Sequence, residues 1–479
     1  MILVSLLFAV LISVPALLIA GASIFMPSFG KVTLWQVIAN IGEPISVLTP
    51  QLRLLAYVCF AIGAAVFLIV AAGHYLLVRR YRSAFGGHGV LLVNYCFALF
   101  VPVFLYASFE YLDTQLDLRY EIDCLRHRST LFRDELVQVD PSGVTFPSKK
   151  RNLIVIAGES LEESFADGAA FGTNALPRLT EWRRRHGAFG QMHTVHGADH
   201  TICALVGMTY GVPRLRTYQD FCLVSYVNYP EILLPSAWDV WLRNGFACKF
   251  VKGGSIRFAC TDKVFKAVPG VELRDTSSYD EDPDYLKEPD KHPFGVNDEV
   301  VIEKHLRRET LELAESDRPF VLVVWTLNTH CPYGWTSAFR PHRHEDQLAD
   351  AVLQTDAMVG DYLDWVEEQP FAENTSVVVI GDHTLHAALG SVPMDVRRPF
   401  NAVSVRGGTR FDGRHDFAAF DFAPTFLELT GAELEDGRFG IGKSLLEKEP
   451  TLLDRIGKKK YEDEIRSCGA DFRRIAFGW

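Results

Sequence analysis

The sequence predicts an α/β domain with a largely parallel sheet, preceded by an apolar membrane segment. Short continuous apolar runs, typical of strands buried on both faces, alternate with segments of helical period. The first quarter of the chain carries very little charge. With 479 residues, the chain is long enough for about three domains of roughly 150 residues each.

The expected elements follow one another as strand and helix. Buried strands are expected at 152–157 (NLIVIA), 246–251, 320–327 (FVLVVWTL) and 376–380 (SVVVI), and helices at 176–186, 300–315 and 348–368. A strand run followed by a helical run is the pattern of parallel βα units, so the sheet is expected to have helices on its faces.

Three apolar stretches precede this domain, at 2–26, 54–78 and 90–109. Each has about 20 residues or more, enough to cross a hydrocarbon core ~30 Å thick. We therefore expect three transmembrane helices. The first stretch could instead be a cleaved signal peptide, although it lacks the basic residues that usually precede one.

Charge sets the expected orientation. Residues 1–112 contain five basic and two acidic residues, so the acidic excess of the chain, net charge −11, falls on the remainder. Arg79, Arg80 and Arg82 crowd the loop between the second and third stretches, which places that loop in the cytoplasm. The rest of the chain is then extracytoplasmic, in a multi-pass inner-membrane protein. An acidic domain of this kind argues against binding to nucleic acid.

The predicted domain organisation has four parts. Residues 1–112 form the transmembrane domain, 113–150 a linker with juxtamembrane helices, 151–447 the catalytic domain and 448–479 a C-terminal extension.

Polar side chains follow three of the predicted strands. Glu159 follows the first strand, His330 the third, and Asp382 with His383 the fourth. Because ligands gather at the carboxyl ends of parallel strands, these side chains are expected at one edge of the sheet. Carboxylate and imidazole ligands together suit Zn²⁺ or Mn²⁺. Taken alone, Asp382 and His383 could equally form a solvated turn.

Thr201 begins a short helix of small and apolar residues, TICALVGMTYG. A hydroxyl at a helix N-terminus lies where backbone amides favour anions, although capping is the commoner role of a threonine there. Beside a metal ion, the same hydroxyl becomes a nucleophile, because the cation lowers its pKa.

The ordered set of motifs resembles the alkaline phosphatase and sulfatase superfamily. It is most similar to the membrane-bound glucan phosphoglycerol transferases, followed by lipoteichoic acid synthases and phosphoethanolamine transferases. The resemblance rests on NLIVIAGESLEESF at 152–165, TICALVGMTYGVP at 201–213, GGSIRFA at 253–259, GVNDEVV at 295–301 and FDFAPTFLELTG at 420–431. It implies an alkaline-phosphatase-like sandwich over residues 151–447.

The resemblance also implies roles for single residues. Glu159, Asp382 and His383 match the family's metal ligands, and Thr201 matches the nucleophile, which also touches the metal. His330 matches a histidine beside the transferred group. A further match, Arg257, implies a phosphate or headgroup contact, although a surface salt bridge is its alternative role.

Two differences from the motifs of related families narrow the range of reactions that the sequence predicts. Sulfatases need Cys or Ser in the pattern C/S-x-P-x-R, and this chain has Thr201-Ile202-Cys203-Ala204 there, which disfavours a sulfatase. Cys203 is a weaker alternative nucleophile, being two residues past the helix start. His386 could hold a second metal, as extra histidines do in phosphoethanolamine transferases, but one divalent ion (Mn, Zn or Mg) is expected.

The resemblance implies transfer of a phosphoglycerol-type group from a membrane phospholipid to an envelope glycan or glucan hydroxyl, through a covalent threonine intermediate. Two other functions stay open from the sequence. The same site could use water as acceptor, as a phosphodiesterase or phosphatase, or the chain could be a membrane sensor with a degenerate domain.

Overall fold

The computed structural model describes residues 1–29, 50–215, 232–258, 261–266, 268–279, 282, 292, 294–337, 340–405 and 410–478. These residues fall into two compact units, Met1–Asp123 and Cys124–Trp479, which are described separately.

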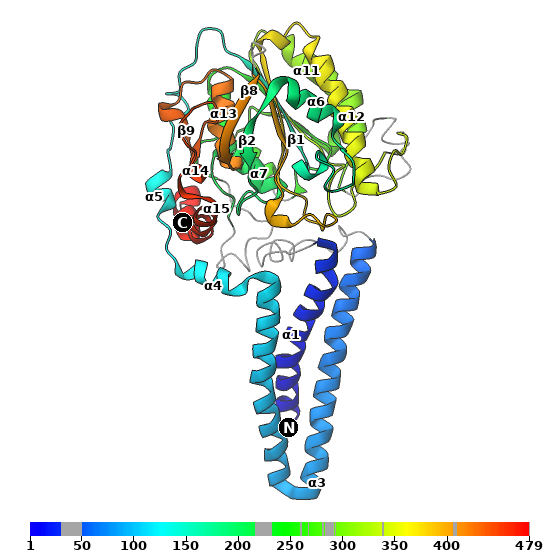
Figure 1. The fold of residues 1–479 in the computed structure, drawn as a ribbon. Coiled ribbons are helices and arrows are strands. Elements are labelled where there is room, and N and C mark those ends of the chain that lie inside the picture. Colours follow the sequence, from blue (N-terminus) through cyan, green and yellow to red (C-terminus); the bar gives the residue numbers. More distant parts are fainter. Residues whose placement is uncertain are drawn as a thin grey trace. The chain divides into compact units, whose positions relative to one another are not determined.

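The first unit consists of apolar helices (Figure 1). Helix α1 spans Ile2–Phe29, and α3 spans Pro50–Leu116 with a reversal at Gly86, where φ is 60° and ψ is −138°. Glycine adopts this left-handed backbone without a steric penalty, so the chain turns back there. Helical segments thus lie at all three apolar stretches. The helices Ile2–Phe25 and Arg53–Leu116 are long and apolar enough to cross a membrane.

The second unit is built on a six-stranded sheet. Its strand order is β4-β3-β5-β1-β6-β7, with every neighbouring pair parallel except β6 and β7. The strands are β1 (Asn152–Gly158), β3 (Ala247–Lys252), β4 (Glu272–Arg274), β5 (Phe320–Trp325), β6 (Thr375–Gly381) and β7 (Asn401–Ser404). The four expected strands are therefore confirmed.

Helices cover both faces of this sheet. Those named in the site description below are α6 (Pro177–His186), α7 (Thr201–Tyr210), α12 (Gln347–Glu367) and α13 (Phe422–Leu429). The other helices of this unit are α5 (Leu131–Glu135), α8 (Ala237–Arg243), α9 (Thr261–Lys266), α11 (Arg307–Ala314), α14 (Leu452–Ile456), α15 (Lys458–Ser467) and α16 (Gly469–Phe477), and α4 (Leu118–Arg126) spans the boundary between the two units. Figure 1 shows α6 and α12 on one side of β1 and α7 and α13 on the other.

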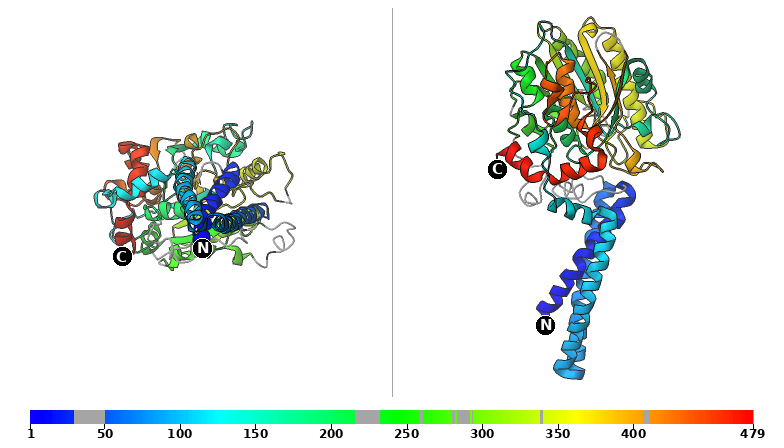
Figure 2. Two further views of the ribbon diagram at one scale, coloured as in Figure 1. Left: turned by 90° about the horizontal axis from the view of Figure 1, so that it is seen from below. Right: turned by 60° about the vertical axis from the view of Figure 1, so that its left-hand side comes forward.

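Shorter elements complete the unit. Two small sheets pair β2 (Gly187–Met192) with β8 (Phe411–Phe417) and β9 (Arg438–Phe439) with β10 (Gly442–Lys443). A π-helical segment, Glu299–Leu306, precedes α11, so the single helix expected at 300–315 changes its winding midway. The red C-terminal helices lie together at one end of this unit (Figure 2).

The core has two layers because successive strand residues point to opposite faces. In β1, Val155 and Ala157 belong to the cluster that includes α7, α8 and α13, whereas Ile154 and Ile156 belong to the cluster that includes α6 and α12. All seven residues of β1 are buried. This explains the continuous apolar run, which a sheet strand covered on one face only would not show.

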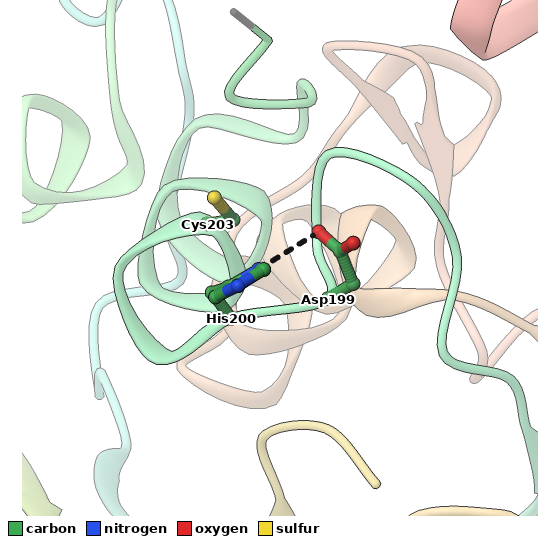
Figure 3. Close-up of side chains that lie close together, drawn as sticks. All are labelled: Asp199, His200 and Cys203. Atoms are coloured by element: carbon green, nitrogen blue, oxygen red, sulfur yellow. Dashed lines mark ion pairs between the residues drawn. The ribbon is translucent and has the colours of Figure 1, made fainter. Parts of the chain in front are cut away.

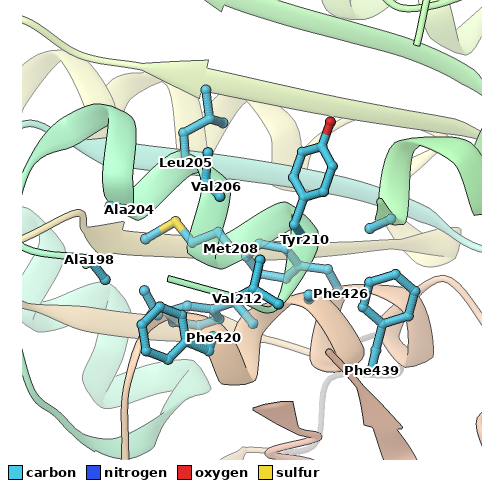
Figure 4. Close-up of a cluster of buried hydrophobic side chains, with 14 of the residues drawn as sticks. Ala198, Ala204, Leu205, Val206, Met208, Tyr210, Val212, Phe420, Phe426 and Phe439 are labelled. Atoms are coloured by element: carbon cyan, nitrogen blue, oxygen red, sulfur yellow. The ribbon is translucent and has the colours of Figure 1, made fainter. Parts of the chain in front are cut away.

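Helix α7 is held deep in one of these layers. Eight of its ten residues are buried, and they pack against Phe420, Phe426 and Phe439 (Figure 4). A Cβ at Gly207 would lie 3.1 Å from the Phe420 ring and 3.2 Å from the Ala419 side chain, so a larger residue there would have to push these neighbours aside. The position of the first residue, Thr201, is therefore determined by packing along the whole helix.

Candidate active site

Glu159, Thr201, Asp382 and His383 meet at the carboxyl edge of the sheet. Glu159 follows β1, Asp382 and His383 follow β6, and Thr201 is the first residue of α7. Glu159, Asp382 and His383 offer ligand atoms within 4.8 Å of one another, and these three residues are almost fully buried. Four residues that were predicted together from the sequence thus lie together.

The Thr201 hydroxyl points into this group. It donates a hydrogen bond to Glu159 Oε2 (2.8 Å) and lies 3.4 Å from His383 Nε2. The N-cap position of α7 is occupied by His200, one residue earlier. Capping is thereby ruled out as the role of Thr201, since its oxygen faces charged side chains rather than capping the helix from the N-cap position.

The turn after β1 places Glu159 by an uncommon backbone conformation. Ser160 has φ of 52°, a left-handed value that costs a residue other than glycine about 1–3 kcal/mol. The Ser160 hydroxyl donates to Glu159 Oε1 (2.9 Å), and the Glu159 amide donates to Thr326 Oγ1 (2.9 Å). The Thr329 hydroxyl donates to the Glu159 carbonyl oxygen. Strain that is held by this many contacts is typical of functional sites.

Asp382 is fixed through both of its carboxylate oxygens. The amides of Ser160 and His383 donate to Oδ1 (2.8 Å each), and Trp325 Nε1 donates to Oδ2 (3.2 Å). The preceding Gly381 lets β6 pass within contact of Leu161, because any Cβ there would lie 1.8 Å from the Leu161 carbonyl oxygen. This close approach brings the ends of β1 and β6 together.

His383 presents one ring nitrogen to the site. Its Nδ1 lies 2.9 Å from the carbonyl oxygen of Thr384, which makes Nδ1 the protonated nitrogen. Nε2 faces the site and lies 3.5 Å from carboxylate oxygens of both Glu159 and Asp382. Burial lowers the pKa of His383, but the charges of Asp382 and Glu159 outweigh this effect and raise it. An imidazole held by a carbonyl in this way is the usual arrangement of a metal-ligating histidine.

The charges in this group are unbalanced. Burial and the charge of Glu159 raise the pKa of Asp382 to about 7. Burial alone would raise the pKa of Glu159, but His330 and His383 lower it. Among the described residues, no Arg or Lys side chain donates a hydrogen bond to Glu159 or Asp382. Two buried carboxylates and an inward-facing imidazole nitrogen therefore fit a divalent cation in both charge and ligand chemistry.

His330 and Arg257 are less closely tied to the group. His330 is half-buried after β5, with Nδ1 2.8 Å from the Cys331 carbonyl oxygen and its ring 4.6 Å from that of Phe294. It is near enough to lower the pKa of Glu159. Arg257 is exposed in the segment after β3 and forms no ion pair with the described part of the chain. Its phosphate contact stays a prediction.

Several residues around the site were not predicted from the sequence. Ser160, Trp325 and Thr329 hold the ligand group by hydrogen bonds. Lys252, at the end of β3, has its pKa lowered by burial to about 8, partly offset by the charge of Glu159. The sequence feature that could have pointed to Lys252 is its position at the end of a predicted strand, just before Gly253 and Gly254.

A buried ion pair supports the loop that carries His383. Glu162 is held by the guanidinium of Arg397, with Nε at 2.9 Å from Oε1, and it accepts the Leu385 amide at 3.0 Å. The same guanidinium donates to the carbonyl oxygens of Leu385 and Ala387. Glu162 therefore links the turn after β1 to the segment after β6.

The chain belongs to the Sulfatase family, whose sequence profile matches residues 151–432. Its fold is that of the alkaline phosphatase superfamily, as the sequence resemblance implied. A protein of that superfamily from Vibrio parahaemolyticus superposes with a TM-score of 0.50 at 20% identity, covering 70% of this chain and 79% of its own. The lipooligosaccharide phosphoethanolamine transferase A of Neisseria meningitidis also superposes with a TM-score of 0.50, at 14% identity, covering 89% and 84%.

Curated relatives include phosphoglycerol transferase I of Escherichia fergusonii, which is 26% identical over 252 residues. The match covers 50% of this chain and only 32% of that relative. The predicted resemblance to phosphoglycerol transferases is thereby confirmed, over about a third of the relative's length.

Proposed function

We propose that this chain is a metal-dependent phosphotransferase of the membrane. In this proposal it moves a phosphoglycerol-type group from a phospholipid to an envelope glycan or glucan hydroxyl through a covalent threonine intermediate. The observation that carries the proposal is the Thr201 hydroxyl, aimed at Glu159 and His383 from the start of a buried helix. The phosphoglycerol transferase relative supports the choice of transferred group.

In the first step, Thr201 Oγ1 attacks the phosphorus of the donor phosphodiester. A bond forms between Oγ1 and phosphorus, and the bond from phosphorus to the diacylglycerol oxygen breaks. Glu159 Oε2, which accepts the Thr201 hydrogen bond, is positioned to receive its proton. His330 is the group we assign to protonate the leaving oxygen.

In the second step, the acceptor hydroxyl attacks the same phosphorus and gives its proton to His330. The bond between phosphorus and Oγ1 breaks, and Glu159 returns the proton to Thr201 Oγ1. Splitting one difficult transfer into two easier ones is the advantage of a covalent intermediate. The N-terminus of α7 and the guanidinium of Arg257 would stabilise the anionic phosphoryl oxygens.

Glu159, Asp382 and His383, with the Thr201 hydroxyl, are the residues that would hold a divalent metal ion, Mn, Zn or Mg. When bound, such an ion lowers the pKa of the hydroxyl and neutralises charge on the phosphoryl oxygens. The buried, unbalanced charges of Glu159 and Asp382 support this assignment.

The test is mass spectrometry of the peptide that contains Thr201, after the purified protein has been exposed to envelope lipids. The expected result is a phosphoglycerol adduct on Thr201 that disappears when a glycan acceptor is added. Thr201→Ala should give no adduct and less than about a thousandth of the wild-type rate, because positioning effects alone leave residual rates of that order. An active Thr201→Ala variant would overturn the covalent role.

The same experiment distinguishes the alternatives. A phosphoethanolamine adduct would identify a phosphoethanolamine transferase. Release of free glycerol phosphate without added glycan would identify a phosphodiesterase or phosphatase that uses water.

We further propose that the chain is a multi-pass inner-membrane protein with its catalytic unit outside the cytoplasm. The support is the pair of long apolar helices and the cluster Arg79, Arg80 and Arg82 beside the reversal at Gly86. A reporter enzyme active only outside the cytoplasm should work when fused to the C-terminus. A cytoplasmic reporter that works there would contradict the proposal.

A further inference from the structure

A second group of ligand-type side chains lies at the start of α7. Asp199, His200 and Cys203 offer a carboxylate oxygen, a ring nitrogen and a sulfur atom that all lie within 4.8 Å of one another (Figure 3). This group shares no residue with Glu159, Asp382 and His383. It is joined to the proposed nucleophile by sequence, because Thr201 lies between His200 and Cys203.

The local backbone explains why these side chains meet. His200 is the N-cap residue of α7, and Cys203 follows three positions later in its first turn. Residues three apart on a helix point to the same side. Asp199 comes from the preceding loop, and its Oδ1 lies 3.3 Å from His200 Nδ1. The three ligand atoms therefore lie within 4.8 Å of one another, while the Cys203 thiol donates a weak hydrogen bond to the Arg214 carbonyl oxygen (3.8 Å).

Two buried histidine nitrogens near this group have no hydrogen-bond partner in the described part of the chain. His200 Nε2 is buried without a hydrogen-bond partner, and so is His386 Nε2. The ring of His386 lies 4.7 Å from that of His200 and stacks at 4.6 Å on that of His383. Buried polar atoms without partners cost free energy, and in native proteins each calls for an explanation such as an ion.

The donor set selects a class of cation. A carboxylate, an imidazole and a thiolate together suit Zn²⁺, whereas Mg²⁺ and Ca²⁺ prefer oxygen ligands. Three protein ligands leave one position of a tetrahedral ion open, as in catalytic zinc sites. His386, whose ring lies 4.7 Å from that of His200, offers a further imidazole that could complete the set.

We propose that Asp199, His200 and Cys203 form a second divalent-cation site of the zinc type, next to the nucleophile. Occupation of this site does not depend on the proposed transfer reaction. Only its role does: a cation there would add positive charge beside the phosphoryl group that Thr201 receives.

The test counts zinc in the full-length protein purified in detergent. Wild type, Cys203→Ser, Asp382→Ala and the double variant are loaded with Zn²⁺, freed of unbound metal and analysed by elemental mass spectrometry. We expect two ions per chain in wild type, one in each single variant and none in the double variant. Cys96→Ala, which removes an exposed cysteine elsewhere, is the matched control and should keep both ions.

Cobalt substitution identifies the ligands independently. A thiolate bound to Co²⁺ gives a charge-transfer absorption that oxygen and nitrogen ligands do not. This band should appear in wild type and in Asp382→Ala and disappear in Cys203→Ser. His200→Gln serves as a second variant in case Cys203→Ser does not fold, and it should also lose one ion.

Two results would overturn the proposal. One is a single zinc in wild type that is lost in Asp382→Ala and unaffected by Cys203→Ser. The other is the absence of a thiolate band in cobalt-loaded wild type. Two bound ions in a protein that forms no adduct on Thr201 would leave the second site standing and contradict the proposed transfer instead.

Discussion

Two buried glutamates, three residues apart after β1, have opposite surroundings. Glu162 is fully buried and is bound by the guanidinium of Arg397, which neutralises it. Glu159 is just as deeply buried, but its neighbours are the carboxylate of Asp382, the imidazole of His383 and the hydroxyl of Thr201. Burial therefore does not separate a structural carboxylate from a functional one.

The difference lies in whether the protein itself balances the charge. Burying an ion costs several kcal/mol unless a well-placed partner repays it. The ion pair with Arg397 offsets that cost for Glu162, so no further charge is required to neutralise this carboxylate. No described Arg or Lys side chain forms an ion pair with Glu159 or Asp382, and burial together with the charge of Glu159 raises the pKa of Asp382. A bound cation would neutralise this pair of carboxylates, as Arg397 neutralises Glu162.

The largest effect should come from Asp382→Ala. Loss of this ligand should release the metal and reduce turnover of the folded protein about a thousandfold or more, since the bound ion lowers the barrier by several kcal/mol. Elemental analysis and an activity assay on the folded fraction measure both quantities. The double variant with Thr201→Ala should be no slower, because the two residues act as a unit. Retained metal with retained turnover would contradict the site.

The next largest effect should come from breaking the buried ion pair between Glu162 and Arg397. Glu162→Ala leaves Arg397 buried without its partner and should lower the free energy of unfolding by about 3–5 kcal/mol. Thermal unfolding in detergent measures this loss. Replacing both partners, as Glu162→Leu with Arg397→Met, should recover most of the stability. A stable Glu162→Ala variant would show that the two glutamates do not differ in the way described.

A smaller effect is expected from Trp325→Phe. This change removes the Nε1 hydrogen bond to Asp382 Oδ2 while keeping most of the buried ring. Residues that orient metal ligands typically change metal affinity or activity by about 10–100-fold, and this single bond should be at the low end. Zinc titration with a competing chelator measures the affinity. An unchanged affinity would mean that Trp325 only fills space.

The last effect is absent at neutral pH and appears only as the solution becomes acidic. Burial lowers the pKa of His292 to about 3 from its ordinary 6.5. Between these two pH values the histidine is protonated in the unfolded chain but not in the folded protein. The free energy of unfolding therefore falls as the pH falls through this range. His292→Gln should flatten the dependence of the unfolding midpoint on pH in this range and leave it unchanged above neutral pH. An unchanged slope would contradict the burial argument.

The sequence was sufficient for the features that depend on local pattern. Strands β1, β5 and β6 were visible as continuous apolar runs because both faces of each are covered. The meeting of Glu159 with Asp382 and His383 followed, since parallel strands end at the same edge. Thr201 was visible as the first residue of a small-residue helix.

Only the tertiary structure decided which buried carboxylates have a partner of opposite charge. Glu162 and Arg397 are 235 residues apart in the chain, and no local pattern pairs them. The same holds for the Trp325 bond to Asp382 and for the passage of Gly381 against Leu161. The strain at Ser160 and the volume shared by Asp199, His200 and Cys203 are likewise set by packing. Local sequence determines which face a residue takes, but charge balance depends on distances between segments, and packing sets those distances.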